Sequence, residues 1–277
     1  MTNDNLDSKL ESKLESEVDT VVRGLYTAYT GMSNEQKRLD IISNNLANSA
    51  TAGFKEDSVT TQSFDNLLTL KLKDSSEAYN DRPIGRMSLG VKLGEVYTNH
   101  GQGSLRQTSG TYDLALEGKG FFTLEVTDKA GNTETQYTRN GSFTVASSGL
   151  LVDANGNHVM GSGGEINIPT DAAEVKIDTS GAIYADGVYV DTLQIADFED
   201  YKYLIKANDT MYKAIDGAVE QDAVATVRQG YTEQSNVNVV AEMVEMISIT
   251  RAYEANQKVI QSVDKTLDLA ANSVGRV

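Results

Sequence analysis

The sequence has no cysteine, no tryptophan, and only two prolines and two histidines among its 277 residues. Without cysteine the chain can form no disulfide, no thiolate metal site and no cysteine nucleophile. No run of about 18 apolar residues occurs, so we expect no helix that crosses a membrane. The first 20 residues are charged and contain no apolar segment of the kind found in secretory signal peptides, so we expect no such signal.

The composition is acidic, with 40 Asp and Glu residues against 24 Lys and Arg residues and a formal net charge of −16. This charge disfavours nucleic acid and acidic membrane surfaces as partners. The hydrophobic content of 39% and aromatic content of 7% predict a modest core.

Catalytic and metal-binding motifs are missing as well. His100 and His158 lie in turn-like sequence without a spaced partner, and each is expected to be a solvated loop residue. Residues Asp153–Asn157 resemble the start of a calcium loop, but Gly164 stands where such a loop needs glutamate, so a hairpin turn is expected. We therefore predict no catalytic residue, no metal site and no cofactor, and we do not expect an enzyme.

Apolar residues spaced by seven mark both ends of the chain. The N-terminal stripe is Val18, Leu25, Met32, Leu39 and Leu46, and the C-terminal stripe is Val239, Met246, Tyr253, Ile260, Leu267 and Val274. Such sustained spacing is typical of coiled-coil packing. It predicts an N-terminal helix at 21–55 that pairs with a C-terminal helix at 230–277. Two amphipathic helices on an ordinary core are the alternative.

Between the stripes the apolar period changes to two. In YDLALEGKGFFTLEV, Leu114 and Leu116 alternate with other side chains, as do Phe122 and Leu124. Turn signals such as Asn140-Gly141 recur along the following residues. The pattern predicts a central antiparallel β sandwich or barrel at about residues 100–210, and so an α+β fold.

The remaining segments are predicted to connect or extend these parts. Residues 56–99 and 211–229 are expected to be connections. Residues 1–20 carry six acids against two lysines, and we expect a disordered extension there.

The stretch SNNLANSATAGFK, from Ser43 to Lys55, is unusually rich in amides. Asparagine is poor inside a helix and favourable at helix ends and turns, and Gly53 suits a left-handed conformation from which Phe54 can pack back. An amide in an apolar seam can also fix register against a partner. We therefore expect a helix end that holds a neighbouring chain or loop; a simple helix cap is the alternative.

Three parts of the chain resemble the bacterial flagellar rod and hook protein family. RGLYTAYTGMSNEQKRLDIISNNLANSATAGFK resembles the N-terminal signature of this family, and QGYTEQSNVNVVAEMVEMISITRAYEANQKVIQSVDKTLDLA resembles its C-terminal signature. LALEGKGFFTLEV, YTRNGSFTV and GLLVDANG match between them. The resemblance covers about residues 21–277, and the length is similar to that of a basal-body rod protein of the distal or proximal type. Family members usually begin a few residues before the position of Arg23, so this chain has about twenty further residues. An upstream start, a solvated tail and an added interaction segment are the alternatives for them, and their charge favours a solvated tail.

The resemblance implies a structural subunit that polymerises into a hollow helical drive shaft, which transmits torque and forms the export conduit for flagellar motility. The terminal helices would pair in the inner tube while the β domain faces outward. The implied partners are other copies, other rod and hook proteins, the flagellar type III export apparatus and ring proteins around the rod, in the basal body of the cell envelope. A hook or other axial component is the first alternative, and a soluble glycan-acting enzyme is a distant one.

The resemblance also implies which residues make assembly contacts. Ser235 to Asn238 would cap and orient the C-terminal helix, and Arg251 to Glu254 would pack in the tube wall. The full set is Leu25, Met32, Leu39, Ser43, Asn44, Asn45, Leu46, Ala47, Asn48, Gly53, Phe54, Ser235, Asn236, Val237, Asn238, Met246, Arg251, Ala252, Tyr253, Glu254, Ile260 and Leu267.

Overall fold

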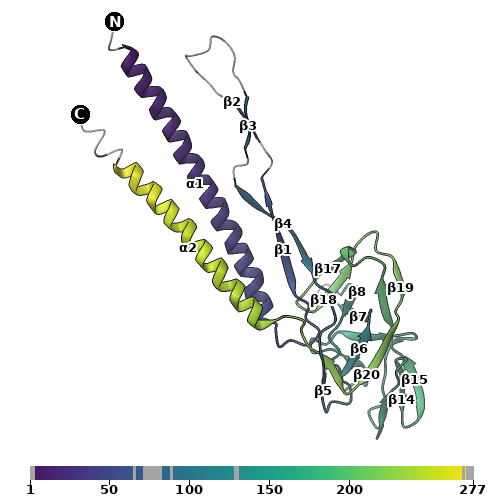
Figure 1. Ribbon diagram of the computed structural model, residues 1–277. Coiled ribbons are helices and arrows are strands. Elements are labelled where there is room, and N and C mark those ends of the chain that lie inside the picture. The colour runs from purple at the N-terminus through teal and green to yellow at the C-terminus, as the bar shows by residue number, and fades with distance from the viewer. Residues whose placement is uncertain are drawn as a thin grey trace. The chain divides into compact units, whose positions relative to one another are not determined.

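The computed structural model describes residues 4–64, 67–70, 83–87, 90–127, 131–269 and 272. It has one helix near each end of the chain and antiparallel strands between them, which confirms the α+β class (Figure 1). The chain divides into two compact units. We call Met1–Ser43, Ser58–Val96 and Val240–Val277 the helical unit, and Asn44–Asp57 and Tyr97–Val239 the β unit.

The two helices differ from the expected ranges at their ends. Helix α1 spans Asp4–Ala47 and helix α2 spans Val239–Leu269. The helical start at Asp4 lies within the extension that we expected to be disordered. Residues 4–20 are rich in Leu, Glu and Lys and contain no Gly or Pro, and this composition favours a helix. Within the described residues, no helix is both long and apolar enough to span a membrane.

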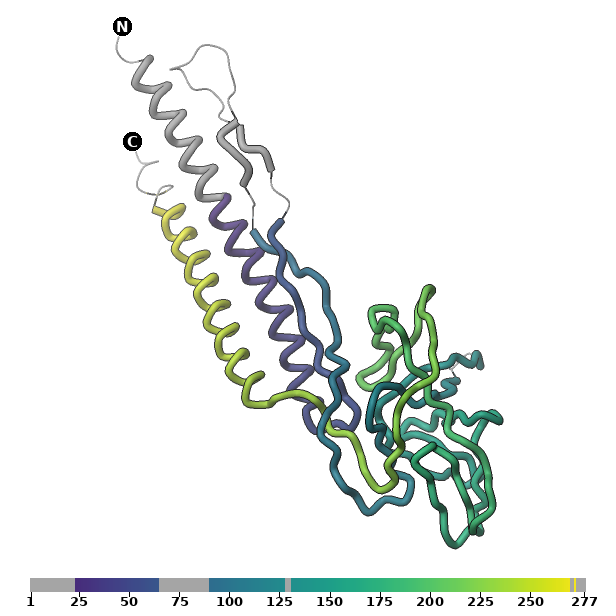
Figure 2. Tube along the Cα trace, turned by 45° about the vertical axis from the view of Figure 1, so that its right-hand side comes forward, coloured from purple at the N-terminus to yellow at the C-terminus, as the bar shows by residue number. Residues whose placement is uncertain are grey.

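Within the helical unit, α1 and α2 lie side by side (Figures 1 and 2). Arg38 Nη2 of α1 is 2.8 Å from Glu245 Oε1 of α2. The deeply buried positions are not those of the seven-residue stripes: they include Ala28 and Asn34 on α1 and Ile249 on α2. The helices that the stripes predicted are therefore present, whereas coiled-coil packing of the stripes stays a prediction.

The expected connection at 56–99 contains a β hairpin. Strand β1 (Asp57–Ser63) pairs with β4 (Val91–Thr98), and β2 (Leu67–Leu70) pairs with β3 (Pro83–Met87). Figure 2 shows β1 and β4 running beside α1. Asn34 Nδ2 of α1 donates a hydrogen bond of 3.3 Å to Thr61 Oγ1 of β1. The hairpin thus covers one side of the N-terminal helix.

The β unit holds the other strands, all paired antiparallel where a register is defined. The main sheet has the order β17-β18-β8-β7-β11-β10-β9, with β16 beside β7, β19 beside β16 and β12 beside β11. Its members are β7 (Phe121–Thr127), β8 (Thr133–Thr138), β9 (Thr144–Val145), β10 (Leu151–Val152), β11 (His158–Gly161), β12 (Gly164–Glu165), β16 (Ile195–Phe198), β17 (Leu204–Lys206), β18 (Met211–Ala214) and β19 (Glu220–Asp222).

Smaller sheets complete the β unit. Strands β13 (Val175–Ile177), β14 (Ala182–Ala185) and β15 (Val188–Thr192) form a three-stranded sheet. Strand β20 (Ala225–Gln229) pairs with β6 (Leu114–Gly118), and β21 (Tyr231–Glu233) pairs with β5 (Leu105–Gln107). A short 3-10 helix, η1, spans Tyr201–Tyr203. The β unit therefore extends through residues 211–229, which we had expected to be a connection.

Strand β7 is covered on both faces, which explains its apolar sequence. Phe122 and Leu124 belong to the larger buried cluster, together with Leu114 and Leu116 of β6. Phe121 belongs to a second cluster with aromatic and aliphatic side chains of β8, β16, β17 and β18. Because successive side chains of a strand point to opposite faces, Phe121 and Phe122 anchor two separate cores. Phe122 and Leu124 share one face as the alternation predicts, but Thr123 is buried as well, because the opposite face of the strand is also covered.

Candidate functional site: a buried junction between the terminal segments

The amide-rich stretch spans the end of α1 and the loop that follows, and its side chains are hydrogen-bonded to residues of that loop and of β1. Asn45 is buried, and its side chain forms two hydrogen bonds with the main chain of Asp57: Asn45 Nδ2 donates to Asp57 O at 2.9 Å, and Asp57 N donates to Asn45 Oδ1 at 3.0 Å. Asn48 Oδ1 accepts a hydrogen bond of 3.1 Å from Thr51 Oγ1. The asparagines thus close the loop between α1 and β1. The prediction that they end a helix is confirmed, since α1 ends at Ala47.

Gly53 brings this loop into contact with residues from later in the chain. Its φ of 71° is the expected left-handed conformation, although Gly53 does not follow the last helical residue directly. Gly53 N donates a hydrogen bond of 2.8 Å to Glu233 O. A Cβ atom at Gly53 would overlap the backbone of Arg139 and Asn140. Glycine is therefore required by conformation and by space together.

Phe54 is fully buried beside Gly53. Lys206 Nζ lies 4.0 Å from the centroid of its ring, a cation–π contact. Lys206 also forms an ion pair of 2.8 Å with Asp57 Oδ2. The expected turn after the helix is thus held by β17 as well as by its own hydrogen bonds.

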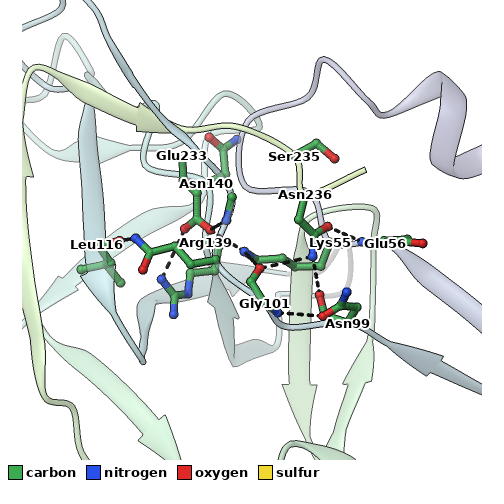
Figure 3. Close-up of polar contacts among 12 residues, drawn as sticks. Lys55, Glu56, Asn99, Gly101, Leu116, Arg139, Asn140, Glu233, Ser235 and Asn236 are labelled. Atoms are coloured by element: carbon green, nitrogen blue, oxygen red, sulfur yellow. Dashed lines mark hydrogen bonds and ion pairs between the residues drawn. The ribbon is translucent and has the colours of Figure 1, made fainter. Parts of the chain in front are cut away.

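A buried ion cluster joins the segment that follows α1, residues 53–57, to the segment that precedes α2, residues 233–236 (Figure 3). We call these two the terminal segments. The Glu233 carboxylate forms ion pairs with Lys55 Nζ and, at 3.3 Å, with Arg139 Nη1, and it accepts a hydrogen bond of 2.8 Å from Gly103 N. The side chains of Lys55 and Glu233 are fully buried, and that of Arg139 is 4% exposed. Lys55 Nζ also donates to Gly101 O at 2.8 Å, and Arg139 Nη2 donates to Gly118 O at 2.7 Å.

Burial lowers the pKa of Lys55, while the negative charge and hydrogen bond of Glu233 act in the opposite direction. Arg139 lowers the pKa of Lys55 further through its like charge. The carboxylate of Glu233 therefore stabilises the positive charges of Lys55 and Arg139, which are both buried.

Asn236 makes a second link between the same segments. Its Oδ1 accepts a hydrogen bond of 2.9 Å from Glu56 N, and its Nδ2 donates to Asn99 O at 2.8 Å and to Gly101 O at 3.2 Å (Figure 3). Ser235 Oγ accepts a hydrogen bond of 3.3 Å from Val237 N. We call residues 53–57, 99–103, 139–140 and 233–236 the junction; all of them belong to the β unit.

His100 lies in the junction among aromatic rings. Its ring centroid is 4.9 Å from that of Tyr201, 5.2 Å from that of Tyr212 and 5.7 Å from that of Phe121. Burial, followed by the positive charges of Lys55 and Arg139, lowers the pKa of His100 to about 4. His100 therefore lies in a loop as predicted, but it is half-buried among rings and not solvated, whereas His158 lies in strand β11 and not in a loop.

Asp153 occupies a hairpin turn, as predicted. Its Oδ1 accepts hydrogen bonds of 2.8 Å from Asn155 N and from Asn157 N, and its Oδ2 accepts one of 2.9 Å from Asn157 Nδ2. Both oxygens of the Asp153 carboxylate therefore accept hydrogen bonds from within the turn. Among the described residues, no group of three or more His, Asp or Glu side chains could hold a metal ion.

The predicted site residues fall into two sets. Asn45, Asn48, Gly53, Phe54 and Asn236 make the loop and junction contacts described above. The others lie on α1, on α2 or immediately beside them, and of these Ser235 also belongs to the junction. The exposed members are Ser43, Asn44, Ala47, Asn238, Arg251, Ala252, Glu254 and Leu267, and the half-buried ones are Leu25, Met32, Leu39, Leu46, Ser235, Val237, Met246, Tyr253 and Ile260.

Three residues of the junction were not singled out from the sequence. Lys55, Arg139 and Glu233 each lie inside or beside a turn and carry no spacing motif. Lys55 and Glu233 are separated by 178 positions, so their pairing has no local signal. The only sequence feature that could have identified Lys55, Arg139 and Glu233 is that each lies in one of the stretches that resemble the family.

These features define a class of protein: a long helix at each end of the chain, and one antiparallel β unit in which the two terminal segments are tied together. Comparison with protein-family models gives three matches in the same order along the chain. Residues 25–55 match "Flagella basal body rod protein", residues 115–185 match "Flagellar hook protein FlgE/F/G D1 domain", and residues 228–273 match "Flagellar basal body rod FlgEFG protein C-terminal".

Curated proteins match over almost their whole length. The chain is 33% identical to the flagellar basal-body rod protein FlgG of Bacillus subtilis, over 91% of this chain and 99% of the relative. It is 31% identical to FlgG of Agrobacterium fabrum, over 91% and 100%, and 31% identical to the rod protein FlgF of Caulobacter vibrioides, over 90% and 96%. The chain belongs to the flagellar basal-body rod protein family. It is a structural subunit of the flagellar basal body and not an enzyme.

Proposed function

We propose that the chain polymerises through its terminal helices into a hollow helical rod that transmits torque and forms an export conduit. The observation that carries this proposal is the apolar surface of α2. Met243, Val244 and Ile247 are 48%, 63% and 54% exposed, and Leu267 is 44% exposed. Met243, Val244 and Ile247 lie within about one turn of α2 and form one exposed apolar patch, whereas Leu267 is a separate exposed apolar position near the end of the helix. Exposed apolar side chains of this kind mark interaction sites, because leaving them in water is unfavourable.

The finer features of this proposal concern packing in the polymer. The seven-residue stripes of α1 and α2 pack in a coiled-coil manner in the inner tube, and the predicted assembly residues on these helices provide the subunit contacts. The β unit, closed as a sandwich or barrel, faces outward. A helix that is not yet packed against neighbours is marginally stable in water, so the helices gain order on assembly.

The proposed partners are other copies of this chain, other rod and hook proteins, the flagellar type III export apparatus and ring proteins around the rod. The subunit reaches the rod through that apparatus without a cleaved signal peptide. The names of these relatives support a rod protein over a hook protein, since FlgG and FlgF are both named as basal-body rod proteins.

The test compares two neighbouring residues of α2. Leu267→Asp places a charge in the predicted stripe, whereas Thr266→Asp places the same charge one position away, at an exposed polar residue. We expect Leu267→Asp to abolish incorporation into basal bodies while the β unit stays folded. The new carboxylate is exposed in the single chain but would be buried without a partner in the proposed subunit contact, which is costly. Incorporation is measured by electron microscopy and immunoblotting of isolated basal bodies. Normal rods from Leu267→Asp, or equal loss in both variants, would contradict the role of the stripe.

A further inference from the structure

The last segment of the β unit, residues 225–236, runs along two other strands before α2 begins; we call it the strap. Val227 of β20 lies opposite Leu116 of β6, and Thr232 of β21 lies opposite Arg106 of β5. Gln234 N donates a hydrogen bond of 2.9 Å to Ser104 O. The strap is thus attached by main-chain pairing along most of its length.

The strap also holds the N-terminal segment. Gly53 N donates to Glu233 O, Lys55 Nζ forms an ion pair with the Glu233 carboxylate, and Glu56 N donates to Asn236 Oδ1. Three of four consecutive residues, 53–56, therefore depend on the strap for a hydrogen-bond partner. If the strap detaches, buried polar groups on the N-terminal segment lose their partners, which is strongly unfavourable.

The charges make this dependence mutual. The carboxylate of Glu233 faces two almost fully buried cations, Lys55 and Arg139. Removing Glu233 leaves both buried cations without a counter-charge, which costs more than the pairs contribute. Removing Lys55 leaves Glu233 paired with Arg139 alone and ends its side-chain contact with residues 53–57. A lesion at Lys55 should therefore loosen the strap, and a lesion at Glu233 should loosen residues 53–57.

We propose that Glu233 is a lock that couples the two terminal segments, so that the strap and residues 53–57 open together as one local unfolding unit. Strands β7 and β8 lie in the middle of the main sheet and bear both buried clusters, so they stay closed in this opening. This coupling goes beyond polymer formation, since it belongs to the single chain and can be measured without assembly.

The first test uses the unaltered full-length chain. Native-state hydrogen exchange is followed at amides of 53–57, of the strap and of β7–β8 in low concentrations of urea. We expect the first two groups to exchange through the same opening, with the same urea dependence, at a rate at least about tenfold above that of β7–β8. Separate openings for 53–57 and the strap, or one shared opening for all three groups, would overturn the proposal.

The second test uses variants. Glu233→Gln keeps the side-chain shape but removes the charge, and we expect exchange at 53–57 and in the strap to rise at least about tenfold while β7–β8 changes less than about twofold. Glu134→Gln, which breaks the half-exposed pair between Glu134 and Lys213, is the matched control and should leave exchange unchanged.

The coupling is then measured with a double-mutant cycle. Lys55→Met should speed exchange in the strap, because Glu233 loses its ion pair with residues 53–57. Lys55→Met combined with Glu233→Gln should have a smaller effect than the sum of the single changes, because Lys55→Met removes one of the two cations that Glu233→Gln leaves unpaired. Additive effects, or an effect of Lys55→Met confined to 53–57, would show that Glu233 does not couple the segments. None of these outcomes depends on whether the chain forms rods.

Discussion

Gly53 combines a backbone conformation and a close contact that can be tested separately. Its φ is 71°, and a Cβ atom there would overlap the backbone of Arg139 and Asn140. Gly156 has a similar φ of 88°, but a Cβ atom placed there would have no other atom within 4 Å. Gly156→Ala therefore carries only the conformational cost, about 1 kcal/mol. Gly53→Ala carries the overlap in addition, and we expect it to lower the free energy of unfolding by about 3 kcal/mol or more.

The comparison is made by urea unfolding of the two variants, with intrinsic tyrosine fluorescence as the signal. Equal losses of stability in Gly53→Ala and Gly156→Ala would mean that the backbone of Arg139 and Asn140 can move away. The requirement for glycine at residue 53 would then be conformational alone.

His100 gives the β unit a specific pH dependence. Its pKa is lowered to about 4 in the folded protein by burial and then by the charges of Lys55 and Arg139, while Asp57 acts in the opposite direction and Lys206 lowers it further. In the unfolded chain His100 takes up a proton near its ordinary pKa of 6.5. Between these two values the unfolded state binds more protons, so stability falls as the pH decreases from about 6.5 to about 4.

The His100→Phe variant keeps a ring among Phe121, Tyr201 and Tyr212 but cannot be protonated. We expect its free energy of unfolding to decrease less steeply than that of the unaltered chain on acidification, by up to about 1.4 kcal/mol per pH unit in this window. Above pH 7 the difference between the two chains should be constant, which provides the control. Parallel curves from pH 7.5 to pH 4.5 would show that His100 is accessible to protons in the folded state.

At the scale of elements, the sequence predicts the helices and strands whose apolar residues recur periodically, and it misses the strands that lack such a period. Helices α1 and α2 follow from seven-residue stripes, and β6 and β7 follow from alternation and flanking glycines. Strand β1, with the sequence DSVTTQS, has half-buried and exposed side chains and no alternation of apolar residues. Strand β20 has a single fully buried residue, Val227. Strand β20 is defined by its pairing with β6, which lies far away in the sequence. Strand β1 is defined by its pairing with β4 in a hairpin that has no apolar pattern.

The junction shows the same limit for side chains. The sequence identifies Asn45, Gly53 and Phe54 as residues that shape a turn, because amides and glycine have local conformational preferences. The ion cluster depends on the meeting of residues 55, 139 and 233, and only the folded β unit brings them together. Charged residues near turns are ordinarily solvated, so burial of Lys55 and Glu233 could not be predicted from composition or spacing.

At the scale of the whole molecule, net charge and apolar surface have opposite effects on assembly. Each chain carries a formal charge of −16, so identical chains repel one another. Salt shortens the range of this repulsion, from about 10 Å at 0.1 M to about 3 Å at 1 M ionic strength. Apolar contacts between helices, such as those proposed for Leu267, are not weakened by screening.

We therefore expect the fraction of chain that sediments as polymer to rise several-fold between about 0.05 M and 0.5 M NaCl, as screening reduces the repulsion. Sedimentation velocity at a fixed protein concentration measures this fraction. The Leu267→Asp chain, which has one more negative charge and lacks the apolar contact, should stay monomeric at both salt concentrations, whereas Thr266→Asp should respond to salt. If association of the unaltered chain instead decreases with salt, complementary ion pairs between subunits outweigh the apolar face of α2, and the contacts should be sought among the charged side chains of that helix, beginning with Arg251 and Glu254.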